Sequence, residues 1–417
     1  MDQTHRPSHD DPLIRGILDQ ESVTVEFQPV CSARKRQVVG VETLTRGVNP
    51  KTGEPIPPGM LFGLAEACGL MVELDRLCRK KTLDRFKQLQ ADHAGLLLFL
   101  NVEAAIIERG VAGSGHLIQL VEELEIRADD IVIELIASRA LDMEVIEEFV
   151  ERHKSAGFNI ALGDMGAGHA SLERVALLKP DVLKVDRVVM HGVDRHFHKQ
   201  EVLRSVINLA RKTGSLVIAE GMETEAETLT ALGLGVDLVQ GHFLAQPAPL
   251  DRGAAIESAQ GAVEKLCASY VTRHVERMRA KIDESRSHRK VVEESLAEAA
   301  IVRFGSFDTF LGEIVHRHPP LECAYILNER GVQVSSTVFD ASIHQPQKHF
   351  IFGPAERGAD HSLKEYFFLL QTGLQTYTTD PYISLASGNF CRTISVPFTG
   401  ADKNNYILCL DFIAQAF

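Results

Sequence analysis

The sequence predicts an α/β protein with three successive parts: a TIM-type (β/α)8 barrel with an irregular start, a long connecting helix, and a smaller α+β domain. Two observations predict the barrel. Eight short runs rich in Val, Ile and Leu recur within the first 250 or so residues, and longer amphipathic stretches separate most of them. Such runs are typical of strands buried on both faces of a mainly parallel sheet, and their alternation with helical stretches is typical of a barrel.

The elements of the predicted barrel can be placed along the chain. The predicted strands lie at residues 24–31, 38–44, 96–101, 131–136, 158–162, 181–185, 215–219 and 236–240. Three predicted helices lie at 61–89, 141–157 and 199–214. The first two strands are so close together that we expect a hairpin, which makes the barrel irregular at its start.

The second part, residues 253–300, is predicted to be one long charged helix because it contains no proline and carries a narrow apolar stripe. The stripe consists of Leu266, Tyr270, His274, Met278 and Ile282. A connector packed on its own domains and a dimer-forming signalling helix both fit this pattern.

The third part, residues 301–417, carries strand-like runs at 324–336, 389–398 and 405–413 with helical stretches beside them. These runs predict an α+β domain with an antiparallel sheet. The expected organisation is therefore an N-terminal extension at 1–20, the barrel at 21–252, the helical linker at 253–300 and the last domain at 301–417.

Composition excludes several classes of protein. The net charge of −13 argues against broad binding to nucleic acid, which usually requires a basic surface. The seven cysteines are odd in number and form no CxxC pair, which is typical of reduced thiols in a cytoplasmic protein. No apolar run approaches the length of a membrane span and the polar N-terminus is no secretory signal, so we expect no membrane insertion.

Polar residues follow or end most of the predicted barrel strands, and this is where barrel enzymes carry their chemistry. They are Glu42, Asn101, Glu134, Asp164, Lys184, Asp186, Glu220, Glu223 and Gln240, and Gly241 follows Gln240 directly. Carboxylates in apolar strands are costly to bury unless they are paired or bind a metal. The combination of several carboxylates, one amide and one lysine predicts an oxygen-ligand site suited to Mg²⁺ or Mn²⁺.

Seven segments, in order, resemble the motifs of the EAL-domain cyclic di-GMP phosphodiesterases. The segments are FQPV (27–30), VETLTRG (41–47), LFLNVE (98–103), IALGDMGAGHASL (160–172), LKPDVLKVDR (178–187), VIAEGMET (217–224) and VQGHFLAQP (239–247). The resemblance covers about residues 20–250. It implies a barrel that cuts cyclic di-GMP to the linear dinucleotide with two divalent cations, which activate the attacking water.

The resemblance also implies roles for individual residues. The implied metal ligands are Glu42, Asn101, Glu134, Asp164 and Glu220. The implied catalytic residues are Glu42, Lys184, which would orient the water or the phosphate, and Glu220, a ligand or base. The implied nucleotide contacts are Gln28, Leu44, Arg46, Asp186, Gln240, Gly241, Pro247 and Glu223, of which Glu223 would also brace the loop after the fifth strand.

The sequence departs from the family pattern at its metal site. Gly163 stands where the family has the first residue of an Asp-Asp pair, the one expected to bridge both cations, and Ala137 replaces a second glutamate after Glu134. Met165 and His169 replace usual aromatic residues. Apart from Asp164, the second residue of that pair, no sequence neighbour of Gly163 carries a carboxylate, so we expect the cations to bind weakly, at a single site, or not at all.

Three functions remain open from the sequence. The first is a degenerate EAL domain that binds cyclic di-GMP as a receptor with little or no hydrolysis. The alternatives are a working Mg²⁺- or Mn²⁺-dependent phosphodiesterase and a protein-interaction scaffold that has lost nucleotide binding. A homodimer and an unknown downstream protein are the expected partners.

The third part resembles PAS- or Cache-type sensor domains in the order of its segments. Tyr366, Asp380, Tyr382 and Arg392 resemble ligand-pocket positions of such sensors. Core and turn residues of a dimerisation domain explain the same residues equally well.

Overall fold

The computed structural model describes residues 11–103, 106–107, 115–136, 142–167, 172–249, 254–340, 354–384 and 387–414. The chain forms two compact units, Met1–His274 and Val275–Phe417. The division falls within a long helix, α11 (Ala254–Ala299), which therefore contributes to both units.

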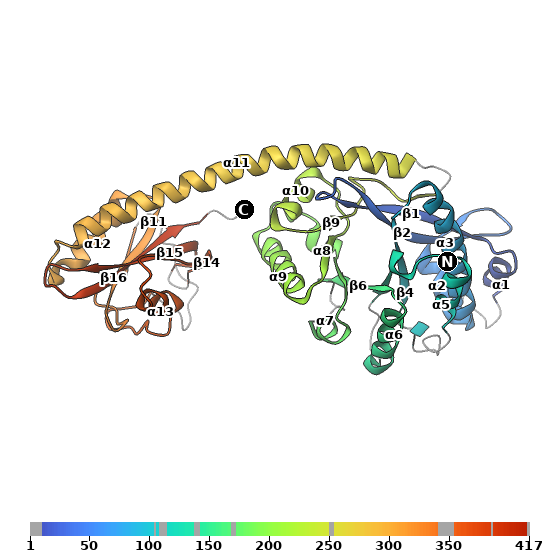
Figure 1. The fold of residues 1–417 in the computed structure, drawn as a ribbon, viewed down its shortest axis with the longest axis horizontal. Helices are drawn as coiled ribbons and strands as arrows, with labels where there is room; N and C mark the ends of the chain where they lie inside the picture. Colours follow the sequence, from blue (N-terminus) through green and yellow to red (C-terminus); the bar gives the residue numbers. More distant parts are fainter. Residues whose placement is uncertain are drawn as a thin grey trace, which may run out of the picture. The chain divides into compact units, whose positions relative to one another are not determined.

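In the described part of the first unit, eight strands close into a barrel (Figure 1). They are β1 (Val23–Ser32), β2 (Gln37–Val48), β4 (Leu97–Glu103), β5 (Ile131–Ile136), β6 (Asn159–Met165), β7 (Val182–Val185), β8 (Leu216–Ala219) and β9 (Leu238–Val239). Neighbours from β2 through β4 to β9 are parallel, whereas β1 runs antiparallel to both β2 and β9 and closes the ring. The predicted barrel and its irregular first hairpin are confirmed.

Two short strands extend this sheet beyond the ring. β3 (Pro55–Ile56) pairs with the end of β2, and β10 (Ala248–Pro249) pairs with β1. The sequence gives no signal for them, because two-residue segments that contain proline carry no strand pattern.

Helices cover the outside of the barrel. They are α1 (Pro12–Asp19), α2 (Pro58–Cys68), α3 (Met71–Asp92), α5 (His116–Glu123), α6 (Met143–Ser155), α7 (Leu172–Leu178), α8 (Arg187–Met190), α9 (Phe197–Thr213) and α10 (Glu225–Leu234), with a 3-10 turn at Ala128–Asp130. The single helix predicted at 61–89 is wrong. Gly69 adopts a left-handed φ of 71° and ends α2, so α3 begins as a separate helix.

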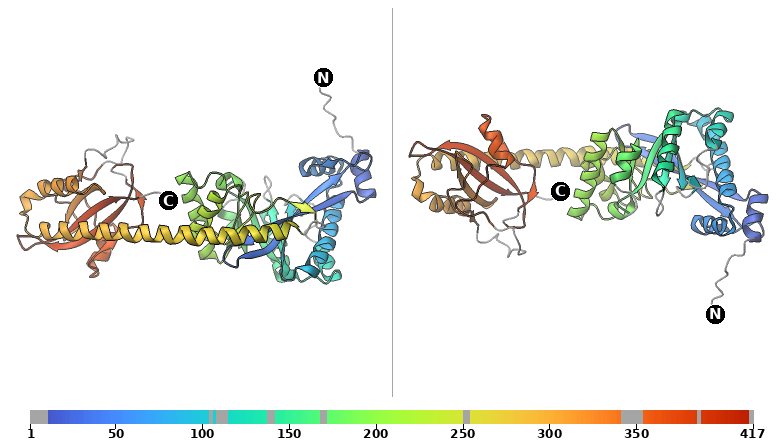
Figure 2. Two further views of the ribbon diagram at one scale, coloured as in Figure 1. Left: turned by 90° about the horizontal axis from the view of Figure 1, so that it is seen from above. Right: turned by 90° about the horizontal axis from the view of Figure 1, so that it is seen from below.

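α11 is one continuous helix (Figure 2), which confirms the predicted long helix, and its C-terminal part belongs to the second unit. The 3-10 turn Phe304–Ser306 and helices α12 (Phe307–Arg317) and α13 (Glu365–Gln371) accompany a sheet that has six strands among the described residues. Its strands are β11 (Leu321–Asn328), β12 (Val338–Phe339), β13 (Tyr377–Thr378), β14 (Tyr382–Ile383), β15 (Phe390–Thr399) and β16 (Asn405–Ile413).

Every described pairing in this second sheet is antiparallel, as predicted. The strand expected at 324–336 is too long: β11 ends at Asn328, and Gly331 turns the chain with a φ of 79°. One face of the sheet packs on α12 and the end of α11, and the other packs on α13. The resemblance of this unit to PAS or Cache domains stays a prediction.

Candidate functional site

An apolar layer fills the barrel below the site. It consists of Val30, Phe99, Val132, Ala161, Val182, Ile218 and Leu238, one residue from each of seven strands. Because side chains alternate between the two faces of a strand, residues two positions nearer the open end also face the interior. On the six parallel strands β4 to β9, the residues two positions beyond the apolar layer are Asn101, Glu134, Gly163, Lys184, Glu220 and Gln240. All of them except Gly163 are predicted site residues.

These residues form a polar layer, together with Gln28 of β1 and Glu42 of β2, which face each other across the first hairpin. The structure therefore brings together most of the predicted metal and catalytic residues. On each of the consecutive strands β4 to β9, an apolar residue is followed two positions later by a residue of the polar layer. This repetition explains why residues far apart in sequence converge.

Lys184 lies at the centre of the polar layer. Its ammonium nitrogen is 3.0 Å from Glu42 Oε2 and 2.5 Å from Glu220 Oε1, and it also donates to Glu134 Oε2. The lysine side chain has no exposed surface, and the three carboxylates are 8–20% exposed. A buried ammonium of this kind requires close counter-charges, and three glutamates supply them.

The charges in this cluster do not balance, because three carboxylates surround one ammonium. Burial would lower the pKa of Lys184, but the neighbouring glutamates raise it well above its usual value. Burial raises the pKa of Glu134 and Glu220, and the adjacent carboxylates raise both further. Burial also opposes ionisation of Glu42, yet Lys184 and two amide donors hold its pKa below the usual value.

Two amide side chains position Glu42. Asn101 Nδ2 donates to Glu42 Oε1 at 3.0 Å, and Gln240 Nε2 donates to Glu42 Oε2 at 2.7 Å and to Gln28 Oε1 at 3.2 Å. Among the described residues, the buried oxygens Asn101 Oδ1 and Gln240 Oε1 accept no hydrogen bond. Buried acceptors without donors are uncommon, and they can serve as ligands for a cation or accept from a bound ligand.

Glu42, Glu134 and Glu220 are the residues best placed to hold a divalent cation. One oxygen of each lies within 4.8 Å of the others, and within the described ranges no other group of three acidic, histidine or cysteine side chains meets this condition. The all-oxygen donor set and the free Asn101 oxygen fit Mg²⁺, Mn²⁺ or Ca²⁺. A cation here would compete with the Lys184 ammonium for the same oxygens.

Gly163 faces this cluster from β6. A Cβ atom on Gly163 would lie 2.7 Å from Glu134 Oε1, so the glutamate of the neighbouring strand occupies the space of the missing side chain. Apart from Asp164, the chain neighbours of Gly163 supply no carboxylate that could replace the aspartate implied by the family resemblance. In the structure, the carboxylate of Glu134 reaches this point from the adjacent strand.

Asp164 follows at the end of β6 with a left-handed φ of 57°, which few non-glycine residues adopt. Its charge contributes to the raised pKa of Glu220, so the two carboxylates are close. Asp164 is not part of the compact group of three glutamates.

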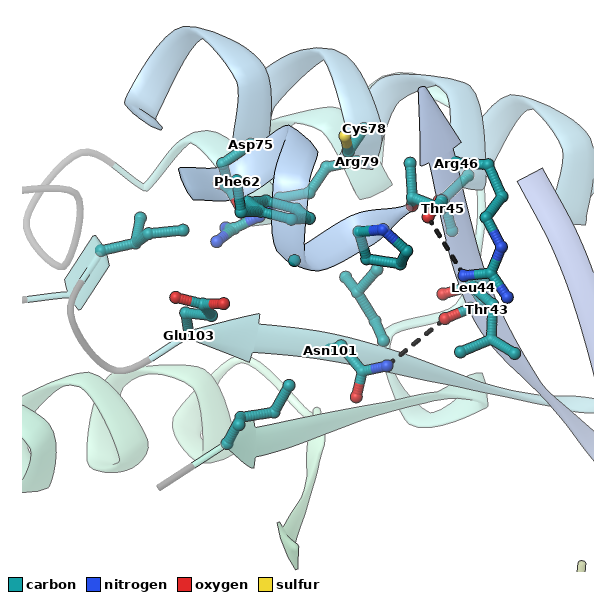
Figure 3. Close-up of a pocket in the computed structure, with 16 residues that line it drawn as sticks. Thr43, Leu44, Thr45, Arg46, Phe62, Asp75, Cys78, Arg79, Asn101 and Glu103 are labelled. Atoms are coloured by element: carbon teal, nitrogen blue, oxygen red, sulfur yellow. Dashed lines mark hydrogen bonds and ion pairs between the residues drawn. The ribbon is translucent and has the colours of Figure 1, made fainter. Parts of the chain in front are cut away.

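Two cavities border the polar layer, and the predicted nucleotide contacts are divided between them. The first cavity, of about 280 Å³, is lined by Leu44, Arg46 and Asn101 (Figure 3). The second cavity, of about 230 Å³, is lined by five other predicted nucleotide contacts: Gln28, Asp186, Glu223, Gln240 and Gly241. Glu42 and Glu220 also line this cavity, whereas Pro247 lines neither of the two.

The second cavity has a firm backbone wall. A Cβ on Gly241 would lie 2.2 Å from Met222 N, so only glycine allows this approach, and the Met222 amide donates to Gln240 O at 3.0 Å. Asp186 accepts from the Val188 amide at 2.6 Å as the N-cap of α8. Glu223 Oε1 lies 2.6 Å from Arg187 Nη2. The predicted contact of Glu223 with the loop after the fifth strand involves residues 168–171, which lie outside the described residues. Ala137 and His169, two positions where the sequence departs from the family motifs, also lie outside them.

Sequence reasoning missed a buried ion pair on α3. Arg79 Nε lies 2.7 Å from Asp75 Oδ2, and both residues are at most 5% exposed. Figure 3 shows them on one side of the first cavity, with Asn101 and Glu103 on the other. Burial raises the pKa of Asp75 despite the adjacent arginine. A pair four residues apart on a helix usually marks a solvated surface, so the sequence offered no signal for this one.

The four residues predicted for a pocket in the second unit do not converge. Tyr366 exchanges hydrogen bonds with Tyr325 and His361 beside α13, and Tyr382 bonds to Thr393 at 2.7 Å. Arg392 lies on the opposite face of β15 from Thr393, against α11. Asp380 is exposed.

The comparisons with known proteins show the family of the barrel. The EAL domain family model matches residues 13–247, more than half of the chain. The chain is 25% identical to the uncharacterized EAL-domain containing protein YkuI of Bacillus subtilis, over 93% of this chain and 94% of YkuI. It is 28% identical to MucR of Pseudomonas aeruginosa, a bifunctional diguanylate cyclase/cyclic di-GMP phosphodiesterase, over 57% of this chain but 35% of MucR.

Solved structures show the same fold. The crystal structure of B. subtilis YkuI in complex with substrate c-di-GMP and calcium has a TM-score of 0.76 at 24% identity, covering 96% of this chain and 99% of that one. The c-di-GMP complex of the P. aeruginosa MucR phosphodiesterase has a TM-score of 0.52 at 24% identity, covering 57% and 97%. No helix in the described ranges is long and apolar enough to cross a membrane.

Proposed function

This chain belongs to the EAL-domain family of cyclic di-GMP-binding and phosphodiesterase proteins, and we propose that it is a receptor that binds cyclic di-GMP and hydrolyses it weakly or not at all. The single observation that carries this proposal is Gly163. Its strand position faces the carboxylate cluster, yet it brings no ligand, and the space of its missing side chain is taken by Glu134, which accepts a hydrogen bond from Lys184.

Recognition of the nucleotide depends on other residues. A cyclic dinucleotide has two bases and two phosphates, and the two cavities beside the polar layer offer two recesses for its halves. Arg46 would bind a phosphate, because its guanidinium presents several donors and its described ion-pair partner, Glu26, is 3.4 Å away and one-quarter exposed. Gln240 and Asp186 line the other recess. None of these contacts requires a metal ion.

Hydrolysis has stricter requirements. A divalent cation held by Glu42, Glu134 and Glu220, with Asn101 as a further ligand, would supply an activated water and neutralise the phosphate charge. Lys184 would hold the water or the phosphate in line. With no carboxylate at position 163, nothing from β6 joins these ligands at that point, so a second cation would lack its bridge.

The alternative is a working phosphodiesterase, and the position of Glu134 favours it. A carboxylate that already leans over Gly163 can replace part of the lost ligand, and three glutamates within 4.8 Å can hold one cation. This alternative predicts turnover that depends on Mn²⁺ or Mg²⁺ and is abolished by Glu42→Gln.

The experiment that separates the two is a product assay. Cyclic di-GMP is incubated with an equal amount of the full chain in Mg²⁺ or Mn²⁺, and the mixture is separated by anion-exchange chromatography. The proposal expects bound but intact cyclic di-GMP after many minutes. Conversion of the cyclic di-GMP to the linear dinucleotide within the same time, lost in Glu42→Gln, would establish the phosphodiesterase instead.

A further inference from the structure

The second unit contains a cavity of about 450 Å³ that the barrel chemistry does not use. One wall is the part of α11 from Ser285 to Leu296, and the other is formed by the chain around β13 and by β15. All of its lining residues belong to the second unit, so that unit alone forms the cavity.

Strand register explains how the cavity forms. Arg392 pairs with Phe412 of β16, and Ile394, two residues further along β15, pairs with Thr378 of β13. Side chains at these positions share one face of the sheet. His288 of α11 stacks on the Phe412 ring with centroids 4.1 Å apart, which holds the helix over this face.

The polar lining consists mainly of donors without partners. Arg392 is half-buried and Arg289 is exposed, and within the described ranges neither guanidinium makes a hydrogen bond or an ion pair. Thr376 and Thr378 add hydroxyl groups at the same wall. The cavity lining carries two guanidinium groups against one carboxylate, Glu293, in a chain whose net charge is −13.

The rest of the lining is apolar. Val292 and Ile394 are at most 8% exposed, and Leu296 continues the same surface along α11. A cavity with donors at one side and an apolar surface at the other suits a molecule with a charged head and a short apolar body.

We infer that this cavity, the α11 cavity, binds a small organic anion whose carboxylate contacts Arg392 and Arg289 and whose apolar body lies on Val292 and Ile394. Such a ligand would touch both the helix and the sheet, and so would hold α11 more firmly on the second unit. The inference does not depend on the proposed function of the barrel.

The test uses the full chain with hexanoate as the probe and hexanamide, its uncharged counterpart, as the matched ligand. Saturation-transfer NMR titrations should give saturable binding of hexanoate and at least about tenfold weaker binding of hexanamide, since one charge-assisted hydrogen bond is worth about a factor of ten or more. Hydrogen exchange should slow in peptides covering residues 285–296 and 376–378 when hexanoate binds.

Variants locate the site. Arg392→Gln should weaken hexanoate about tenfold, and Arg392→Lys should recover part of the loss. Arg286→Gln is the control, because Arg286 lies on the same helix, pairs with Asp283 and is outside the cavity. Equal binding of hexanoate and hexanamide, or unchanged binding in Arg392→Gln, would overturn the inference. Binding of inorganic phosphate without binding of hexanoate would also overturn it.

Discussion

Glu134 Oε1 lies 2.7 Å from the point that a Cβ atom on Gly163 would occupy, although the two residues belong to different strands. The glutamate also accepts a hydrogen bond from Lys184. The position of the lost aspartate is therefore filled by a carboxylate that is already engaged with an ammonium group. This relationship supports the weak cation binding that we propose for this site.

Restoring the aspartate should restore chemistry. Gly163→Asp places a carboxylate beside the three glutamates, and Glu134 can move aside because the clash is with the end of a flexible side chain. We expect Mg²⁺-dependent hydrolysis of cyclic di-GMP to rise by at least about 10- to 100-fold, the usual scale of changes around metal ligands. The rate of appearance of the linear dinucleotide measures this.

Gly163→Ala is the matched control for that variant. It displaces Glu134 in the same way but supplies no ligand, so its hydrolysis should stay at the wild-type level. An equal gain in both variants would show that the position of Glu134, rather than the missing carboxylate, limits the reaction.

Arg46 should contribute to nucleotide affinity. Arg46→Gln removes a charge-assisted hydrogen bond to phosphate, and we expect the Kd for cyclic di-GMP to rise about tenfold or more. Arg85→Gln on α3 is the control, because Arg85 is exposed and bonds only to Gln88 among described side chains. Equilibrium dialysis at fixed ionic strength measures both, and equal Kd values for wild type and Arg46→Gln would exclude this contact.

Lys184 should stabilise the first unit. Lys184→Met leaves three buried carboxylates without their cation, and removing one partner of a buried ion pair costs about 3–5 kcal/mol in the free energy of unfolding. The pKa of Glu134 is already raised, so the free energy of unfolding falls as the pH rises and Glu134 ionises. Without the Lys184 ammonium, the pKa of Glu134 should rise further, and this fall should be larger. The deficit should therefore be larger at pH 8 than at pH 5.

Calorimetric unfolding of the full chain checks this, with the exposed Lys212→Met as control. A deficit that is the same at both pH values would mean that the carboxylates do not depend on Lys184.

Asp411 should make the stability of the second unit depend on pH. Burial raises the pKa of Asp411 from 3.8 to about 6. Because the folded pKa is the higher one, the folded state binds the proton more tightly, so the contribution of Asp411 to stability is fully present below pH 3.8 and is lost as the pH rises through 6. A shift of about two pH units corresponds to about 3 kcal/mol.

Asp411→Asn should remove this dependence, and it should gain stability relative to wild type between pH 4 and 7. Calorimetry at several pH values measures the gain, with the exposed Asp380→Asn as control. A constant difference between wild type and Asp411→Asn across this range would contradict the assignment.

Much of the barrel could be predicted because its signals are local. Each strand is an apolar run. On β4 to β9, the residue of the polar layer stands two positions after the residue of the apolar layer, as Lys184 does after Val182. The break at Gly69 was equally local, but the surrounding helix pattern concealed it. In the second unit, Gly331 ended a strand that the apolar pattern had extended.

The features that could not be predicted depend on contacts between distant segments. Glu134 leans over Gly163 only because β5 and β6 are neighbours in the ring. The Asp75–Arg79 pair lines a cavity only because α3 lies beside β2 and β4. Charge and spacing in the sequence carry no information on which side of a helix the barrel covers.

The central claim is binding of cyclic di-GMP without efficient cleavage. The measurement that tests it most directly is a calorimetric titration of the full chain with cyclic di-GMP in Mg²⁺ buffer, since the chain has no tryptophan to report binding by fluorescence. We predict saturable binding at micromolar or tighter affinity, with the heat signal returning to baseline after each injection. Sustained heat after each injection, or no binding at all, would contradict the claim.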